Sequence, residues 1–286
     1  MTATGNVSYY YVEGLELFGN PEDMVIDGTN KFIIPVAQVG EQTFYTFAEA
    51  AAVAQAGSEI ILLANIEGGI TVPANVTLNG NGFAISGGIT ADGTITFAGV
   101  TKAGNFGVKN VNTVVNIPAG ASLQLTGSGR MVIGHGCTFN ITGTIEDAKT
   151  ADKATLTPSL VMPGASFTGA GVTFNVTNAY ISAPSSYCSS NNSASGTFDF
   201  NITNSIWDSA GKLAFEAQAT AAKVDFALVN SVLTTGSHLV FGTASGEEGV
   251  VIDNSLVNQG TSRQIENRGT MTIKNGAVVN GAVATS

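Results

Sequence analysis

The second half of the chain repeats one pattern of apolar and polar residues. Two apolar residues, two positions apart, precede an asparagine, as in Phe200-Asn201-Ile202-Thr203-Asn204. Five copies place this asparagine at Asn178, Asn204, Asn230, Asn254 and Asn275, at intervals of 26, 26, 24 and 21 residues. Alternation with a period of two predicts a strand with one buried face, and repetition at this interval is typical of a solenoid with one coil per repeat.

A second register supports the same coil length. Leu213-Ala214-Phe215 and Leu239-Val240-Phe241 are also 26 residues apart. We therefore expect parallel strands that stack coil on coil, with like residues on like. An apolar residue also stands two positions after each asparagine, and we expect these residues to continue the buried face through a corner: Tyr180, Ile206, Val232, Leu256 and Ala277.

Prolines mark a longer interval in the first half. Pro73, Pro118 and Pro163 lie 45 residues apart, each directly after an apolar residue. A single coil does not comfortably use 45 residues, so we interpret each interval as about two coils.

One stretch near the N-terminus predicts a helix. Thr46 and Glu49 have the spacing of a capping box, and the Ala-rich residues that follow are strong helix formers up to Gly57. We expect a helix from Phe47 to about Ala56. It is suited to cover the open end of a strand stack, where unpaired backbone groups must be hidden from other chains.

These patterns together predict an all-β protein, a single-stranded parallel β-helix with a short N-terminal capping helix. We expect an extended N-terminal segment at residues 1–36, a strand with the capping helix at residues 37–58, and the β-helix at residues 59–286. Within the first segment, residues 7–12 ("VSYYYV") are predicted to be extended, and "VIDGTNKFIIPVAQV" a short strand, a turn and another strand.

Composition limits the possible partners. Of 286 residues, 44% are hydrophobic and 11% charged, which indicates a folded core. Eleven Lys and Arg against 21 Asp and Glu give a net charge of -10, which disfavours nucleic acid and anionic membrane surfaces. No apolar run reaches the roughly 18 residues of a membrane span. The start of the chain lacks a signal peptide, so we expect either a mature or recombinant start or release without one, as for virion proteins.

The repeat residues resemble those of right-handed parallel β-helices of the pectate-lyase-like kind. In such proteins an asparagine often occupies a tight left-handed corner, because asparagine tolerates positive φ and its amide bonds the copies above and below. The right-handed sense is implied by this resemblance, and a left-handed or irregular solenoid is the alternative. Residues 37–86 also resemble a module that often opens β-helical regions in bacterial surface proteins. Ser58 and Asn65 stand where that module usually carries Asp, so no role of those acids is carried over.

Hydrolytic chemistry is the first candidate function that the resemblance raises. "IGHGC", with His135, matches a short motif of polygalacturonase-like hydrolases. Glycoside hydrolysis also needs paired carboxyl groups, one to protonate the leaving oxygen and one to activate water or attack the sugar. The sequence has no "NTD" or "DD" motif, so we interpret His135 as an exposed turn residue.

Lyase and metal chemistry have weaker support. Arg130, Lys212, Arg263 and Arg268 are the basic candidates, but they are scattered over different repeats, and the acids show no ladder spacing. Residues 27–30 ("DGTN") offer oxygen ligands without the spacing of a calcium loop, so a β-turn is the preferred interpretation. We assign no catalytic, cofactor-binding or metal-ligating residue.

Three further residues are open to two interpretations. Trp207, the only tryptophan, follows an Ile206 that we expect to face inward, so alternation points it outward, either to stack on a sugar or to lie under a loop or partner. Cys137 and Cys188 are more simply explained as two small buried residues than as a disulfide.

The sequence favours a non-catalytic structural or adhesive protein of the cell surface or an extracellular assembly. We expect it to associate with copies of itself, through the N-terminal segment and its lateral surfaces, and carbohydrate is a further candidate ligand. A β-helical polysaccharide lyase or glycoside hydrolase is one alternative, and a phage tail fibre, tailspike or decoration protein is another.

Overall fold

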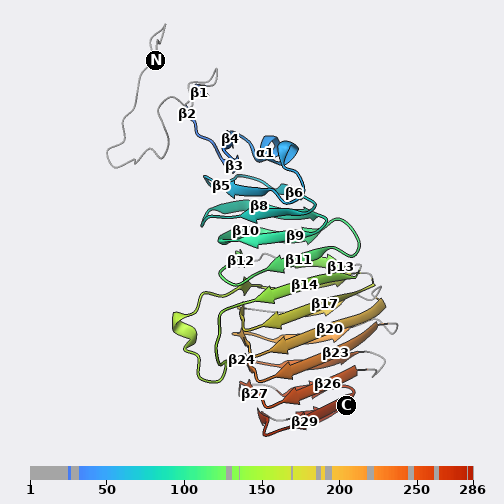
Figure 1. Cartoon of the computed structure of the whole chain (residues 1–286). Helices are drawn as coiled ribbons and strands as arrows, with labels where there is room; N and C mark the ends of the chain where they lie inside the picture. The colour runs from blue at the N-terminus through green and yellow to red at the C-terminus, as the bar shows by residue number, and fades with distance from the viewer. Residues whose placement is uncertain are drawn as a thin grey trace.

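The protein folds as a stack of parallel β-coils (Figure 1). The structure, a computed structural model, describes residues 25–26, 32–126, 131–134, 136–168, 170–184, 188–190, 195–217, 222–243, 248–260, 264–281 and 283–285. Their strands pair in parallel except near the N-terminus. The predicted fold class, an all-β parallel β-helix with one short helix, is confirmed.

One ladder of strands, here the first ladder, runs the length of the stack and lies toward the viewer in Figure 1. Its parallel strands in chain order are β5 (Glu59–Leu62), β7 (Val76–Asn79), β9 (Ile95–Ala98), β11 (Val114–Ile117), β14 (Cys137–Thr142), β17 (Ala170–Thr177), β20 (Ser195–Thr203), β23 (Ala222–Val229), β26 (Glu248–Asp253) and β29 (Thr270–Lys274). The predicted register is confirmed, because Phe174, Phe200, Phe226, Val250 and Met271 are partners in successive coils.

Two more ladders complete each later coil. The second ladder consists of β12 (Ser122–Leu125), β15 (Leu160–Val161), β18 (Tyr180–Ala183), β21 (Ile206–Ser209), β24 (Val232–Thr235), β27 (Leu256–Gln259) and β30 (Val278–Asn280). The third consists of β13 (Met131–Gly134), β16 (Ala165–Thr168), β19 (Cys188–Ser190), β22 (Leu213–Ala217), β25 (Leu239–Thr243), β28 (Ile265–Asn267) and β31 (Val283–Thr285). Leu213 and Phe215 lie opposite Leu239 and Phe241, as predicted.

The earliest coils are built from fewer and longer strands. β6 (Ile70–Pro73) pairs with β8 (Ala84–Asp92), which pairs with β10 (Val100–Val108). β10 then pairs with both β12 and β13, so one bent strand serves the second and third ladders together.

Stacked aromatic rings fill the space enclosed by the ladders. Phe139 and Phe174 lie with ring centroids 4.7 Å apart and an interplanar angle of 8°. Phe174 and Phe200 continue the stack at 5.6 Å and 15°. Equivalent residues in successive coils therefore bury one another, as nearest-neighbour packing in a solenoid requires.

The repeated asparagines form the predicted corner. Asn178, Asn204, Asn230, Asn254 and Asn275 all have positive φ, between 44° and 53°. The amide of Asn204 donates to Asn178 at 2.9 Å, and that of Asn254 donates to Asn230 at 2.7 Å. Asn75, Asn81 and Asn112 also adopt positive φ, at corners that the sequence pattern did not indicate.

The alternation shifts by one residue at this corner, which corrects two sequence predictions. Thr203 and Asn204 both lie outside the core, Ser205 is buried, and the next inward side chain is Trp207, which is fully buried. Trp207 therefore does not point outward. The apolar residues two positions after the asparagines Asn178, Asn204 and Asn230 do not extend the inner core either. They face outward, as Tyr180, Ile206 and Val232, and pack in a separate apolar cluster.

A helix and an antiparallel hairpin close the N-terminal end. β3 (Ala37–Val39) pairs antiparallel with β4 (Gln42–Phe44) and with β5, so it covers the edge of the first ladder. The helix α1 (Phe47–Val53) begins with the predicted capping box of Thr46 and Glu49, but it ends earlier than predicted. Upstream, β1 (Val25–Ile26) and β2 (Phe32–Ile33) form the expected hairpin. Residues 7–12 lie outside the described part of the chain.

The three prolines do not hold equivalent positions in the coils, so their regular spacing does not mark a repeat. Pro73 ends β6, Pro118 follows β11, and Pro163 follows β15, so they occupy three different places in the coil. Asparagines at one position of the first ladder give the real spacing, which is 24 residues from Asn116 to Asn140 and 35 from Asn140 to Asn175. The second 45-residue interval thus contains one enlarged coil, in which residues 143–159 leave the solenoid between β14 and β15.

Candidate functional site

Residues 143–159, here called the excursion, cross the outside of several coils. They contain one 3₁₀ turn, η2 (Lys153–Thr155), and appear as the yellow-green loop at the left of the stack (Figure 1). The excursion lies over the outward apolar row of the second ladder. Tyr180, Ile206 and Val232 are direct partners in successive coils.

Apolar contacts attach the excursion to this row. Ile145 and Ala148 pack with Ile206, which is 2% exposed, and Leu156 packs at the margin of the same cluster. Without this cover the row would present a contiguous apolar stripe to solvent. The excursion therefore explains why the outward positions of Tyr180, Ile206 and Val232 are apolar.

Polar contacts fix the excursion along the corner ladder. The side-chain amide of Asn204 donates to the carbonyl oxygens of Ile145 and Glu146 at 3.1 and 3.0 Å and accepts the N–H of Ala148 at 3.1 Å. Lys149 Nζ donates to Asn254 Oδ1 at 2.6 Å. Lys153 Nζ lies 2.9 Å from Asp208 Oδ1. The excursion is thus bound to several coils beyond the one that it interrupts.

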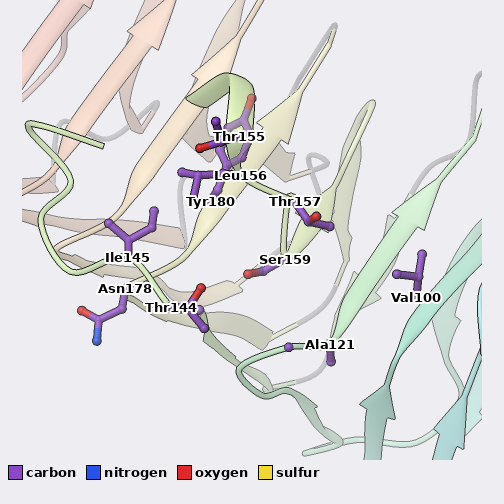
Figure 2. Close-up of a pocket in the computed structure, with 12 residues that line it drawn as sticks. Val100, Ala121, Thr144, Ile145, Thr155, Leu156, Thr157, Ser159, Asn178 and Tyr180 are labelled. Carbon is purple, nitrogen blue, oxygen red and sulfur yellow. The ribbon is translucent and has the colours of Figure 1, made fainter. Parts of the chain in front are cut away.

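A groove of about 360 Å³ separates the base of the excursion from the body of the solenoid. Figure 2 shows Tyr180 beside Thr155 and Leu156, with Thr157 and Ser159 between this group and Ala121. The remaining lining residues are Val100, Gly120, Gly143, Thr144, Ile145 and Asn178.

The groove has the chemistry of a neutral binding site. Its lining offers the hydroxyl groups of Thr144, Thr155, Thr157, Ser159 and Tyr180, and none of its described residues is acidic or basic. Hydroxyl groups both donate and accept hydrogen bonds, and the half-buried Tyr180 adds an aromatic surface. This combination suits an uncharged polyhydroxylated ligand.

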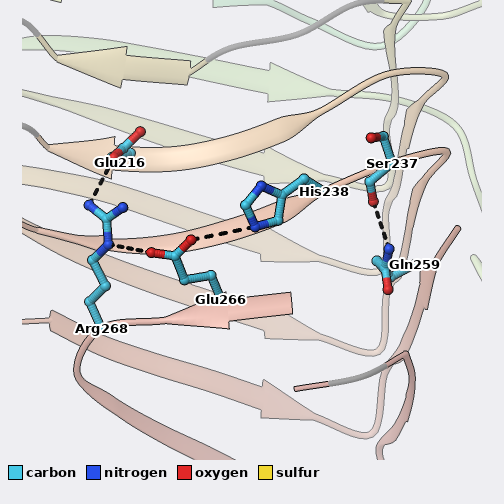
Figure 3. Close-up of polar contacts among 6 residues, drawn as sticks. All are labelled: Glu216, Ser237, His238, Gln259, Glu266 and Arg268. Atoms are coloured by element: carbon cyan, nitrogen blue, oxygen red, sulfur yellow. Dashed lines mark hydrogen bonds and ion pairs between the residues drawn. The ribbon is translucent and has the colours of Figure 1, made fainter. Parts of the chain in front are cut away.

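A second cluster joins charged residues on the third ladder (Figure 3). Arg268 Nη1 donates to Glu216 at 2.9 Å, and Arg268 Nε donates to Glu266 at 2.7 Å. His238 Nε2 lies 3.5 Å from Glu266 Oε2. Glu216 lies opposite Gly242 in the next coil, and Arg268 belongs to the coil after that. Because glycine has no side chain, nothing separates the side chains of Glu216 and Arg268.

This cluster brings a basic candidate to acids from two coils, which the scattered positions in the sequence did not indicate. Arg268, one of the basic candidates, does meet two carboxylates from different coils. Burial lowers the pKa of Arg268, but its hydrogen bond to Glu266 and the charge of Glu216 outweigh this effect, so the pKa is raised above its ordinary value. Arg268 therefore stays charged and is no candidate base. The cluster shares no residue with the groove.

The other sequence candidates that the structure describes do not line the groove. Lys212 precedes β22, and Cys137 is buried in the core. His135, Arg130, Arg263 and residues 27–30 are outside the described part of the chain, as is the side chain of Cys188. The residues that the structure describes contain no group of three or more His, Cys, Asp or Glu side chains able to hold a metal.

Sequence reasoning missed both the excursion and its groove. The available signal was the interval of 35 residues between Asn140 and Asn175, which exceeds the 26 residues from Asn175 to Asn201. The outward apolar row was a second signal, because apolar residues on the outside need a cover. It could not be recognised, because the sequence pattern alone assigns these residues to the inner core.

Comparisons with known proteins assign no family. Neither protein-family models, nor curated proteins, nor solved structures give a match to this chain. In the described part of the chain, no helix has the length and apolar character needed to span a membrane.

Proposed function

We propose that the protein is a non-catalytic adhesive β-helix protein of an extracellular or cell-surface assembly, which binds neutral carbohydrate in the groove beneath the excursion. The observation that supports this proposal best is the composition of the groove. Its described lining contains five hydroxyl-bearing side chains, of which Tyr180 is aromatic, and one asparagine, but no charged residue. In a chain with a net charge of -10, a neutral lining favours a neutral ligand over a uronate polymer.

Two features of the molecule disfavour an enzyme. Glycoside hydrolysis requires two carboxyl groups at the bond that is cleaved, and the lining residues provide none. The carboxylates of Glu216 and Glu266 are bound to the guanidinium of Arg268, outside the groove. That arrangement is suited to tie coils together, because a permanently charged guanidinium neutralises carboxylates of two strands.

The cell-surface setting rests on two further features. Residues 37–86 resemble a module that often opens β-helical regions in bacterial surface proteins, which favours a bacterial surface protein with a pectate-lyase-like β-helix. Only 11% of the residues are charged, which suits broad polar contacts with copies of the same chain. We include self-association, through residues 1–36 and the lateral surfaces, in the proposal.

The groove is tested with soluble neutral oligosaccharides and isosteric variants. Isothermal titration calorimetry of a panel of neutral oligosaccharides should identify a ligand for the wild type. Thr144→Val and Thr157→Val replace exposed groove hydroxyls by methyl groups and should weaken its binding about 2- to 10-fold each, the cost of one hydrogen bond. Thr150→Val is the matched control, because Thr150 lies on the excursion outside the groove and should leave affinity unchanged.

The outcomes separate the possible conclusions. Binding that is equally strong in Thr144→Val, Thr157→Val and Thr150→Val would place the ligand elsewhere and contradict the groove. The same holds if no neutral oligosaccharide binds. Release of new reducing ends during incubation with the ligand would overturn the non-catalytic part of the proposal.

A further inference from the structure

The outward side of the first ladder carries a regular array of uncharged polar residues. The sequences "TFNIT" in β14, "TFNVT" in β17 and "DFNIT" in β20 are in register, so their outward residues lie opposite one another in successive coils. We call the asparagine row and the C-terminal threonine row of these strands the threonine-asparagine face. Neither row is part of the apolar repeat that the sequence reveals.

The asparagine row is fixed by its own hydrogen bonds. Asn140 donates to Asn116 at 3.0 Å, Asn175 donates to Asn140 at 3.0 Å, and Asn201 donates to Asn175 at 3.1 Å. A side-chain amide has two N–H groups and an oxygen with two lone pairs, so each ladder bond leaves one donor and one acceptor site on each inner amide. These remaining groups are held at the spacing of neighbouring strands, about 4.8 Å.

The threonine row runs parallel to it. Thr142, Thr177 and Thr203 are partners in successive coils, and all three are exposed. They lie two residues after the asparagines, which places the two rows on the same side of the sheet, about 6.5 to 7 Å apart along the strand. The β-branched threonine side chain has few rotamers in a strand, so its hydroxyl is also restricted.

The face is uncharged, and no element in the described part of the chain covers it. Its two rows contain only asparagine and threonine, and charged residues begin beside it, at Asp199 in β20 and at Lys223 and Asp225 in β23. Figure 1 shows the first ladder toward the viewer with no other element in front of β14, β17 and β20, while the excursion lies at the side of the stack.

We propose that the threonine-asparagine face binds the flat, ordered surface of an insoluble neutral polysaccharide. Donors and acceptors that repeat at fixed intervals in two directions match a ligand whose hydroxyl groups also repeat, whereas a single sugar would reach only one or two of them. Because the amide ladder already fixes its side chains, binding costs little additional side-chain entropy. This site lies on a different ladder from the groove, and the proposal does not depend on groove binding.

The test is depletion of the protein from solution by microcrystalline cellulose and by crystalline chitin. The face variant is Thr142→Val/Thr177→Val/Thr203→Val, which removes three hydroxyl groups and keeps the β-branched shape. The control variant is Thr71→Val/Thr90→Val/Thr234→Val, which makes the same change at outward positions of β6, β8 and β24. The melting temperature of each variant shows whether it is folded.

We expect at least one powder to deplete the wild type and the control variant, and the partition constant of the face variant to fall at least 10-fold. Depletion should change little between low and high salt, because the face is uncharged. Thr157→Val should bind the powder like the wild type, which separates this site from the groove. Equal depletion of the face and control variants would overturn the proposal, as would no depletion of the wild type by either powder. Sedimentation that shows a wild-type dimer lost in the face variant would instead assign the face to a second copy of the chain.

Discussion

The hydroxyl oxygen of Ser231 accepts the backbone N–H of Ser205, one coil earlier, at 3.0 Å. Both residues are fully buried. The Ser231 hydroxyl also donates to the carbonyl oxygen of Val229 at 2.7 Å. The same contact joins Ala179 to Ser205 and Ser231 to Ser255. A buried serine after the corner asparagine therefore satisfies a backbone amide where the chain leaves one ladder for the next.

Replacing Ser231 by alanine should destabilise the protein by about 1 to 3 kcal/mol. The variant leaves the buried N–H of Ser205 without its partner, and an unsatisfied buried donor costs more than an average hydrogen bond. The carbonyl of Val229 loses the Ser231 hydroxyl but keeps the backbone N–H of Asn204. Urea unfolding measures the loss. Ser182→Ala is the matched control, since Ser182 lies at an outward position of β18, and its effect should stay within about 0.5 kcal/mol. Equal effects of the two substitutions would contradict this role of the serines.

The fold was predictable from sequence because a solenoid repeats its constraints. Each coil needs a residue that tolerates positive φ at the same corner, and the spacing of Asn178, Asn204 and Asn230 reveals it directly. Alternation could not predict which side chains face inward after the corner. A residue in the left-handed conformation moves the next inward position by one, so Ile206 and Trp207 exchange the faces that period two assigns to them.

The groove was not predictable for a different reason. Its walls come from the excursion and from the second ladder, and their contact depends on side chains far apart in sequence, as between Ala148 and Asn204. The sequence of residues 143–159 does not by itself show which coils this segment crosses. The sequence shows which residue types are present, but not where they lie relative to the groove. It lacks the motifs that carry the paired carboxyl groups of glycoside hydrolysis.

Asn204→Gly should loosen the excursion, whereas Asn230→Gly should not. Glycine tolerates the positive φ of both positions, which is 46° at Asn204 and 50° at Asn230, so both variants keep the corner. Of these two side chains, only that of Asn204 is hydrogen-bonded to the excursion in the described structure, at Ile145, Glu146 and Ala148. Limited proteolysis should cleave within residues 143–159 faster in Asn204→Gly than in Asn230→Gly, and its free energy of unfolding should fall by about 1 to 3 kcal/mol. Equal cleavage rates would show that the side chain of Asn204 does not hold the excursion.

Trp207, the only tryptophan, should report a dry core environment. It is fully buried and packs edge-on against Phe215 with ring centroids 5.1 Å apart. Its fluorescence should be blue-shifted and resist quenching by acrylamide, and addition of saccharide should not change it. Trp207→Ala should cost about 3 to 5 kcal/mol in urea unfolding. Trp207→Phe should cost much less, because in the described structure Trp207 Nε1 has no hydrogen-bond partner. Strong quenching of the folded protein would contradict the buried position.

Asp199→Asn should stabilise the protein at neutral pH. Burial raises the pKa of Asp199 above 3.8 and the neighbouring Asp225 raises it further, while the hydrogen bond from Thr173 opposes them. The charged form is thus disfavoured in the folded state. We expect a gain below about 1 kcal/mol, because solvent screens this outward pair.

The pH dependence of this gain has a definite sign. A carboxyl group with a raised folded-state pKa binds its proton more tightly when folded, so the penalty of Asp199 is present above that pKa and disappears as the pH falls. The stability difference between Asp199→Asn and wild type should therefore shrink through the raised pKa and vanish below 3.8. Urea unfolding of both proteins across this range measures it. A difference that grows on acidification would show that the proton is instead released on folding.

Arg268→Met should destabilise the third ladder without affecting carbohydrate binding. The side chain of Glu216 is 10% exposed and relies on Arg268 Nη1 at 2.9 Å, and Glu266 relies on Nε at 2.7 Å. Removing the guanidinium leaves two close carboxylates with their charge uncompensated, and we expect a loss of about 2 to 3 kcal/mol in urea unfolding. Adding Glu216→Gln to Arg268→Met should recover part of this loss, because it removes one uncompensated charge, and the double-mutant cycle gives the coupling. A cluster that holds coils together predicts unchanged affinity for the groove ligand in every folded variant. Loss of binding in a variant with normal unfolding would instead make Arg268 part of a ligand site.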